Sequence, residues 1–178
     1  MQMPRIVLFL ILLFAAKENQ SQNQTVNWIT MEQALKETNF DPKPIFVYFY
    51  TKNCGWCRKM ETETLTNQNI INYLNTNYYS VKLASESTDT VLAFNHTFVN
   101  QQLGKNTPHD FVAYFLKGEL LFPACTFLNS NKELILNAKG YRKPLEFMAL
   151  LIYLKNNHFI QQPDFNQYLK TFKFDINE

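Results

Sequence analysis

Runs of apolar and polar residues along the chain predict a sheet interleaved with helices. Residues 45–50 (IFVYFY) are six consecutive apolar or aromatic residues that follow an Asp-Pro-Lys-Pro turn. Such a run is typical of a strand buried on both faces, as in a parallel sheet. Residues 78–84 alternate as a second strand. Residues 124–128 and 133–138, joined by an Asn-Ser-Asn turn, predict an antiparallel hairpin.

Helical patterns separate these strands. Thr30 and Gln33 fit a capping box at the start of a short helix. A later helix is expected to have Thr107 as its N-cap, Pro108 at its first position and Gly118 just beyond its end. Strands separated by helices indicate a mixed α/β sheet flanked by helices. The helices are expected at about 31–38, 58–65, 69–77, 108–117, 144–156 and 163–172.

The first residues have the pattern of a targeting segment. Residues 6–16 are all apolar, follow a short basic start and end sharply at Lys17. This run is shorter than the roughly 20 residues that a membrane-spanning helix needs, and it is typical of a signal peptide. An uncleaved N-terminal anchor is the alternative. Export would place the mature chain where disulfides persist.

The composition excludes several classes of protein. With 178 residues, 46% hydrophobic and 18% charged, the chain can bury a real core and is not disordered. Its net charge of +2 is too small and too evenly mixed to indicate a nucleic-acid partner. The four glycines lie too far apart for a phosphate-binding loop, and three cysteines are too few for a disulfide scaffold.

The candidate chemistry lies in Cys54-Gly55-Trp56-Cys57, where the strand predicted at 45–50 meets a helix. Two cysteines at this spacing can close a disulfide. The first lies where the free N–H groups and the dipole of a helix favour an anion. The thiolate is the nucleophile, and such positions lower the pKa of a cysteine to roughly 3.5–7.5. We therefore expect Cys54 to attack a substrate and the more buried Cys57 to resolve the mixed disulfide.

Other interpretations of the cysteines stay open at this point. The pair could be an inert structural disulfide, or part of a zinc site. His96 and His109 lack paired ligand spacing, and with His158 they are expected to be ordinary surface or hydrogen-bonded side chains. Cys125 lies in an apolar strand, so we expect a small buried hydrophobic residue, with a regulatory thiol as the alternative.

In combination these motifs resemble those of thioredoxin-fold proteins, in particular the exported bacterial thioredoxin-like proteins with a CGWC site. The resemblance covers about 27–154. It implies a thioredoxin-like fold in which Pro123 is cis and faces the cysteine pair. The segments that carry the resemblance are 43–50 (KPIFVYFY), 54–60 (CGWCRKM), 122–128 (FPACTFL) and Gly140-Tyr141.

The resemblance also implies an activity, a thiol–disulfide oxidoreductase that acts on cysteines of exported proteins or peptides. Cys54 and Cys57 would be catalytic, while Trp56 and Pro123 would shape the groove and Phe122 would pair its backbone with an extended substrate. No cofactor is required because the redox group is the cysteine pair itself. A membrane-bound partner is expected to recycle the pair in the periplasm. The alternative is a non-catalytic peptide-binding module with a structural disulfide.

Two positions depart from the pattern of the family. Tyr48 stands where many members have a buried Asp that assists proton transfer, and a phenol with a pKa of about 10 is a poor proton acceptor at neutral pH. Asn53 replaces a Trp that often precedes the first cysteine. Proton transfer at Cys57 is therefore expected to use water or another group, with Glu86 and Lys82 as candidates.

These observations together predict the organisation of the chain. We expect a signal peptide at 1–20, a thioredoxin-like domain at 25–157 and a C-terminal helical extension at 158–178. The stretch 85–118 is longer than in a minimal thioredoxin. We expect it to be an inserted helical cover that includes a small hairpin at 94–99.

Overall fold

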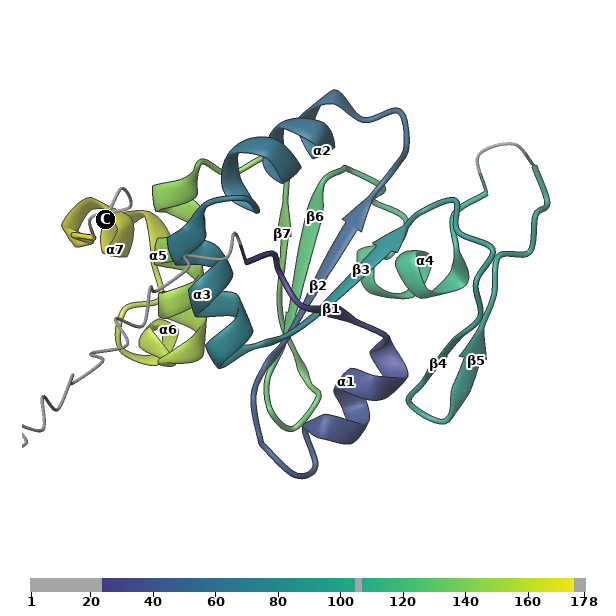
Figure 1. The fold of residues 1–178 in the computed structure, drawn as a ribbon, viewed down its shortest axis with the longest axis horizontal. Coiled ribbons are helices and arrows are strands. Elements are labelled where there is room, and N and C mark those ends of the chain that lie inside the picture. The colour runs from purple at the N-terminus through teal and green to yellow at the C-terminus, as the bar shows by residue number, and fades with distance from the viewer. Residues whose placement is uncertain (1–23, 105–106, 175–178) are drawn as a thin grey trace, which may run out of the picture.

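The structure, a computed structural model, describes residues 24–104 and 107–174, which fold around a five-stranded sheet (Figure 1). The strands lie in the order β1-β3-β2-β6-β7, where β1, β3 and β2 are parallel and β6 and β7 are antiparallel to their neighbours. The predicted mixed sheet with an antiparallel edge is therefore confirmed. The strands are β1 Trp28–Ile29, β2 Ile45–Tyr50, β3 Tyr79–Ala84, β6 Ala124–Leu128 and β7 Leu134–Lys139.

Strand β2 is the centre of the sheet, and its side chains divide the core in two. Ile45, Phe46, Val47, Tyr48 and Phe49 are all fully buried. Phe46 and Tyr48 belong to the core on one face and the other three to the core on the opposite face, because neighbouring side chains alternate across a strand. This confirms the doubly buried strand predicted from the sequence.

Helices cover both faces of the sheet (Figure 1). Helices α3 (Gln68–Asn77) and α5 (Pro144–Lys155) pack on the face that contains Phe46. Helices α1 (Met31–Glu37) and α4 (Asp110–Leu116) pack on the other face. Most of α5 is buried and apolar all round, as expected of a helix enclosed on several sides.

The two predicted N-caps have different outcomes. Thr30 caps α1 as predicted, because its hydroxyl oxygen accepts a hydrogen bond from the backbone N–H of Gln33 at 3.1 Å. The N-cap of α4, predicted at Thr107, is instead His109. The Nδ1 atom of His109 accepts the N–H of Phe111 at 3.1 Å, and its Nε2 atom lies 2.8 Å from the carbonyl oxygen of Asp89. The buried imidazole thus has partners at both nitrogens. Because His109 is the N-cap, α4 begins at Asp110, two residues later than predicted.

The helix that follows β2 changes its winding. It begins as α2 (Gly55–Lys59) and continues as a π-helical turn, Met60–Thr64. The N–H of Leu65 reaches the carbonyl oxygen of Met60 at 2.9 Å, which is the i+5 bond of a π-helix. The sequence located this helix correctly but not its winding.

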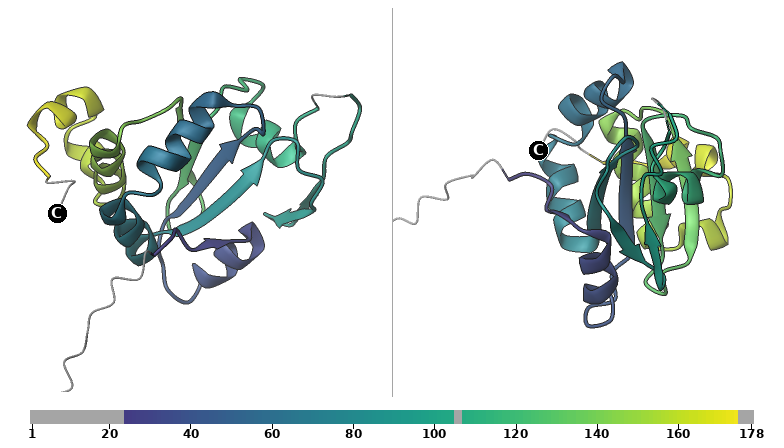
Figure 2. Two further views of the ribbon diagram at one scale, coloured as in Figure 1. Left: turned by 45° about the horizontal axis from the view of Figure 1, so that its top comes forward. Right: turned by 90° about the vertical axis from the view of Figure 1, so that its right-hand side faces the viewer.

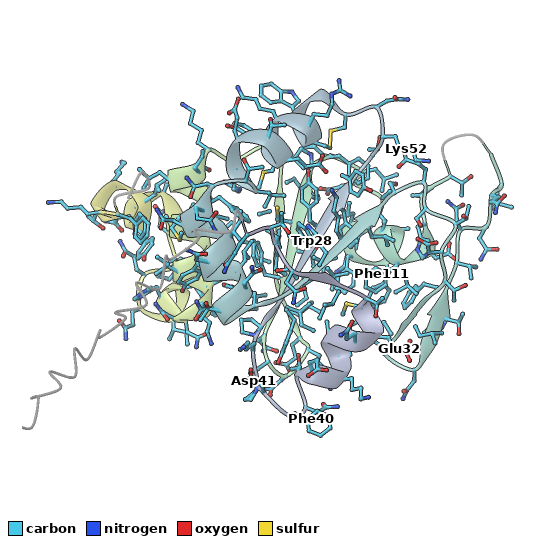
Figure 3. All side chains as sticks on the ribbon, in the orientation of Figure 1. Trp28, Glu32, Phe40, Asp41, Lys52 and Phe111 are labelled. Carbon is cyan, nitrogen blue, oxygen red and sulfur yellow. A yellow bond between two sulfur atoms is a disulfide. The ribbon has the colours of Figure 1, made fainter. Side chains whose placement is uncertain are left out.

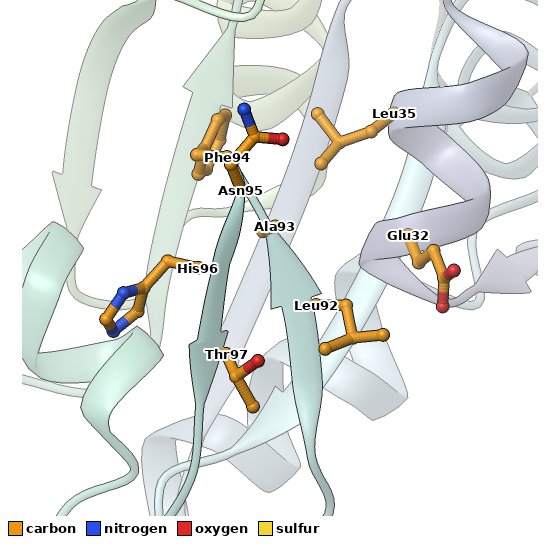
Figure 4. Close-up of a pocket in the computed structure, with 8 residues that line it drawn as sticks. All are labelled: Glu32, Leu35, Leu92, Ala93, Phe94, Asn95, His96 and Thr97. Carbon is orange, nitrogen blue, oxygen red and sulfur yellow. The ribbon is translucent and has the colours of Figure 1, made fainter.

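The stretch 85–118, which we expected to be an inserted helical cover with a small hairpin, has α4 as its helical part. It contains a small hairpin, β4 (Val91–Ala93) with β5 (His96–Phe98), which begins earlier than the predicted 94–99. Phe94 and Asn95 form its turn with φ of 52° and 58°. Such values are unusual for phenylalanine, so this turn has little signal in the local sequence. A pocket of about 280 Å³ separates this hairpin from α1 (Figure 4).

The C-terminal part forms two short helices rather than one. Helix α6 (His158–Gln161) was not predicted, and α7 (Phe165–Thr171) corresponds to the helix predicted at 163–172. Both lie outside α5, away from the sheet (Figure 2), where Tyr153 packs against the ring of Phe165 at 5.2 Å. Asp164 caps α7 with its carboxylate.

The predicted signal peptide, residues 1–20, lies outside the described residues. Within the part of the chain that the structure describes, none of the helices combines the length and the apolar character needed to cross a bilayer.

Candidate active site

The site is built around a disulfide between Cys54 and Cys57, at the point where β2 ends and α2 begins. The two Cα atoms are 5.1 Å apart, since one turn of helix brings the side chains together. Cys54 is the N-cap of α2, and its sulfur accepts a hydrogen bond from the N–H of Cys57 at 3.0 Å. The free N–H groups of the helix therefore point toward the first sulfur.

The two sulfurs differ in accessibility. Cys57 is only 2% exposed, whereas Cys54 is partly exposed. Lys52 lies in the exposed loop that leads from β2 into the disulfide, at the end of the sheet away from α1 (Figure 3). Cys57 is thus the more buried of the two, as expected from the sequence.

The loop before β6 lies beside the disulfide. The bond between Phe122 and Pro123 is cis, as the family resemblance predicted. Ala124 pairs with Phe49 near the end of β2, so the residues before Ala124 extend toward the cysteines. The N–H of Gly140 donates to the carbonyl oxygen of Pro123 at 2.8 Å and fixes this loop to the end of β7. Phe122 and Asn53 line the same pocket, of about 370 Å³.

Trp56 forms an aromatic surface next to the disulfide. It is 59% exposed, and its ring stacks on Tyr141 with centroids 5.7 Å apart. The ammonium of Lys59 lies over both rings, 5.5 Å from Trp56 and 5.1 Å from Tyr141. The hydroxyl of Tyr141 donates to Glu63 at 2.6 Å. The tryptophan is thus held by its neighbours while remaining exposed to solvent.

A polar group lies under the disulfide where the family often has an Asp. The hydroxyl of Tyr48 donates to the carbonyl oxygen of Cys57 at 3.2 Å. Burial, and then the negative charge of Glu61, raise the pKa of Tyr48 far above its usual value. The phenol therefore stays protonated at neutral pH and acts as a hydrogen-bond donor to the backbone.

The two proton-transfer candidates have separate environments. Lys82 forms an ion pair with Glu61 at 2.8 Å, and its ammonium lies 4.7 Å from the ring centre of Tyr50. Glu86 lines the pocket beside Asn53 instead, and its Oε1 accepts the N–H of Lys52 at 2.7 Å. Lys82 is thus the candidate that lies beside Tyr48, with its ammonium 5.9 Å from the centre of that ring.

Cys125 lies in β6, directly opposite Tyr48 in the pairing of the two strands. It is 1% exposed and forms no disulfide. Burial raises the pKa of the Cys125 thiol to about 12. The expectation that this residue is a small buried hydrophobic one is confirmed.

The histidines lie apart from the disulfide. His96 packs edge-on against Phe98 in the hairpin, and His109 caps α4. In residues 24–104 and 107–174 no three side chains of His, Cys, Asp or Glu are grouped so that they could hold a metal ion. The largest described pocket, about 620 Å³, lies between β7, α5 and the C-terminal helices, away from the cysteines.

Sequence reasoning missed two contributors to the site. Glu61 was not identified as a candidate from the sequence. Its position four residues after Cys57 was the available signal, because residues at this spacing share one face of a helix. Tyr141 was noted only as part of a motif. Its stacking on Trp56 depends on the meeting of two distant segments, for which the sequence has no local signal.

Comparison with known proteins agrees with this fold. A thioredoxin-fold protein from Helicobacter pylori is 12% identical with a TM-score of 0.58, over 73% of this chain and 84% of that chain. A thioredoxin from Thermus thermophilus is 16% identical with a TM-score of 0.55, over 74% and 88%. At this identity the two structures support the fold alone. The predicted thioredoxin-like fold is thereby confirmed.

A curated relative and a family model also match. Spermatogenesis-associated protein 20 of Rattus norvegicus is 32% identical over 81 residues, which are 45% of this chain. The chain spans only 10% of the length of that protein. The model of the family Thioredox_DsbH, described as "Protein of unknown function, DUF255", matches residues 16–169. Because this match covers most of the sequence, the chain belongs to the Thioredox_DsbH (DUF255) family.

Proposed function

We propose that the protein is a thiol–disulfide oxidoreductase that acts on cysteines of exported proteins. One observation carries the proposal, the position of the Cys54–Cys57 disulfide. Its first sulfur is accessible at a helix N-terminus, and its second sulfur is buried behind it. This difference suits a pair in which one cysteine exchanges with a substrate and the other resolves the intermediate.

The exchange balances in atoms and electrons. A substrate thiolate attacks the Sγ atom of Cys54, a new S–S bond forms, and the Cys54–Cys57 bond breaks. Cys57 leaves as a thiolate and takes up a proton. A second substrate thiolate then attacks the substrate sulfur, and Cys54 leaves as a thiolate. The substrate dithiol loses two electrons and becomes a disulfide, while the cysteine pair gains them; the reverse sequence reduces a substrate.

The surroundings support both halves of this cycle. The N-terminus of α2 favours the thiolate form of Cys54. Lys82 and Glu61, paired beside Tyr48, are the groups that we assign to proton transfer and charge balance at the buried sulfur. Tyr48 has a different part, because its hydroxyl fixes the backbone of Cys57.

Substrate binding is assigned to the two sides of Cys54. Phe122 would offer its backbone to an extended peptide, with Pro123 and the exposed ring of Trp56 as the walls of the groove. The catalytic residues are then Cys54 and Cys57, and no bound cofactor is needed. The substrates are protein or peptide thiols and disulfides.

The location and the organisation of the chain remain part of the proposal. The apolar run at 6–16 supports a signal peptide at 1–20 and hence export to the periplasm. The redox domain would be 25–157, followed by the helical extension 158–178, and a membrane-bound partner would recycle the pair. N-terminal sequencing of the protein recovered from a bacterial periplasm tests this location, and recovery of the uncleaved chain in the cytosol would contradict it.

A redox titration of the protein in glutathione buffers tests the activity, with trapped thiols counted by mass spectrometry. We expect Cys54 and Cys57 to equilibrate while Cys125 stays reduced. A midpoint near or below about −230 mV indicates a reductant, and one near about −120 mV an oxidant or isomerase. Failure of the pair to equilibrate in the folded protein would contradict the proposed oxidoreductase activity and favour a peptide-binding module with a structural disulfide.

A further inference from the structure

We propose that the pocket beside Cys54 is a subsite for a lysine or arginine side chain of the substrate, recognised by the carboxylate of Glu86. This inference rests on the proposed function, because it names the class of peptide that the disulfide accepts. The protein would then exchange fastest with thiols or disulfides that have a basic residue next to the reacting cysteine.

The position of the pocket is the first argument. It has a volume of about 370 Å³ and is lined by Asn53, the residue before Cys54. It is also lined by Phe122, the residue before the cis proline. A peptide bound between these two loops therefore places a side chain near its cysteine into this pocket.

The charge of the pocket is the second argument. Among the described residues that line it, Glu86 is the only charged one, and Thr51, Ser85 and Thr107 are polar and neutral. The Oε1 atom of Glu86 accepts the N–H of Lys52 at 2.7 Å, which orients the carboxylate. Such a pocket favours a cation and disfavours an acidic side chain by like-charge repulsion.

The second oxygen of the carboxylate is the third argument. The Oε2 atom of Glu86 is buried, and none of the described residues gives it a hydrogen bond. A buried acceptor without a partner is costly, and a charged one more so. An ammonium or guanidinium group in the pocket would lower this cost through its positive charge. The substrate would thus supply a charge that the described lining residues do not.

The apolar wall matches the rest of a basic side chain. Leu120 is 41% exposed, and it lines the pocket together with Phe122. Lysine and arginine have a methylene stem below the charge, and they bury this stem on apolar surface while the charged head meets a polar group. The pocket therefore offers separate contacts to both parts of such a side chain.

The test uses short peptides with two cysteines that differ only in the residue next to the first cysteine, which is Lys, Gln or Glu. The second-order rate at which each peptide dithiol reduces the oxidised protein is measured by stopped flow. Dithiothreitol, which is uncharged, is the reference that reports the disulfide chemistry alone. The same peptides are reacted with a small disulfide, because a lysine also makes its neighbouring thiol more reactive, and the protein rates are divided by these.

We expect the corrected rate to be about fivefold higher for the Lys peptide than for the Glu peptide, and the ratio to shrink at high ionic strength. Glu86→Gln should bring the ratio close to one, and Glu86→Lys should reverse it. Glu32→Gln is the matched control, since it removes the same charge from α1, away from Lys52 (Figure 3) and outside the lining of this pocket, and should preserve the ratio.

The outcomes separate the two proposals. If dithiothreitol does not reduce the disulfide of the folded protein, the proposed function fails. If dithiothreitol reduces the pair but the corrected rates for the Lys and Glu peptides are equal, the subsite is wrong and the oxidoreductase stands. A preference that persists in Glu86→Gln would likewise overturn the part assigned to Glu86. Thermal unfolding of each variant shows that the comparison is made on folded protein.

Discussion

The hydroxyl of Tyr48 donates a hydrogen bond to the carbonyl oxygen of Cys57 at 3.2 Å, directly under the disulfide. Tyr48, which stands where many family members have an Asp, thus makes a specific contact with the site. The same carbonyl also accepts the N–H of Met60 within the helix. Tyr48 therefore connects the central strand to the backbone of the buried cysteine. A phenol that stays protonated can donate this hydrogen bond, whereas it is poorly suited to accept a proton.

Replacing Tyr48 by phenylalanine tests this interpretation. Tyr48→Phe keeps the buried ring but removes the donor, so we expect the free energy of unfolding to fall by about 1 kcal/mol. The rate of reduction by dithiothreitol should change less than about threefold, since the phenol is not the proton acceptor. Urea unfolding and stopped-flow kinetics measure the two quantities.

A second tyrosine supplies the control for that change. Tyr79→Phe removes an exposed hydroxyl that donates to the carbonyl oxygen of Asp41 at 3.2 Å, and it should cost much less stability than Tyr48→Phe. A tenfold slower reduction of the disulfide in Tyr48→Phe would show that the phenol takes part in proton transfer and would contradict our assignment.

Removing either charge of the Glu61–Lys82 ion pair should shift the midpoint potential of the disulfide, in opposite directions for the two residues. Glu61→Gln leaves Lys82 without its partner near Cys57, which favours the thiolate. A stabilised reduced state makes a disulfide more oxidising, so we expect the midpoint potential to rise by about 20–30 mV. Lys82→Gln leaves the carboxylate unpaired and should lower the potential by a similar amount.

The double variant Glu61→Gln/Lys82→Gln completes a cycle for this pair. Because both charges are removed, its potential should lie close to that of the unmodified protein. Equal shifts of the same sign in the two single variants would mean that the potential responds to disturbed packing and not to charge, and would remove the pair from the mechanism.

The aromatic surface beside the disulfide leads to a prediction on substrate binding. Tyr141→Ala removes the ring under Trp56, so the tryptophan loses its fixed orientation. We expect the exchange rate with peptide dithiols to fall about threefold to fivefold while the rate with dithiothreitol stays the same. Tyr141→Phe retains the stack and loses only the bond to Glu63, and it should keep most of the peptide rate.

Fluorescence of Trp56 gives an independent check on that prediction. Its emission should differ between the oxidised protein and Tyr141→Ala, and much less between the oxidised protein and Tyr141→Phe. If all three proteins exchange with peptides at one rate, the surface formed by Trp56, Lys59 and Tyr141 does not contact the substrate.

The sequence predicted those parts of the fold that depend on local pattern. The central strand at 45–50 has apolar residues on both faces, and the pattern reflects its burial between two helical layers. The hairpin at 91–98 was misplaced because its turn contains Phe94 at φ 52°, a residue with no preference for this conformation. Packing against Tyr114 and Phe115 of α4 holds the turn instead, and such contacts are absent from a local pattern.

The candidate site divides in the same way. The cysteine pair could be found from its spacing, and Pro123 from the resemblance to thioredoxin-fold proteins. The Glu61–Lys82 pair joins the helix after the disulfide to β3, and the stack of Trp56 on Tyr141 joins two segments far apart in the chain. These relationships follow from the register of the sheet and the path of the helix, so they needed the structure.

The buried thiol of Cys125 should make the folded protein less stable as the pH rises into the alkaline range. Burial raises its pKa to about 12 in the folded protein, whereas the unfolded chain has the ordinary value of about 8.5. The folded-state pKa is the higher one, so its contribution to stability is complete below the unfolded value and is lost as the pH rises through about 9 toward 12. The slope of this loss is about 1.4 kcal/mol per pH unit.

Cys125→Ala isolates this contribution, in a background where Cys54 and Cys57 are both serine so that no disulfide exchange occurs. At neutral pH the alanine should cost about 1 kcal/mol, because it leaves a small cavity in β6. Above about pH 9 the difference between the two proteins should narrow, because only the protein with Cys125 loses stability through this thiol. Urea unfolding at several pH values measures it, and a difference that stays constant with pH would show that Cys125 ionises as easily in the folded protein as in the unfolded chain.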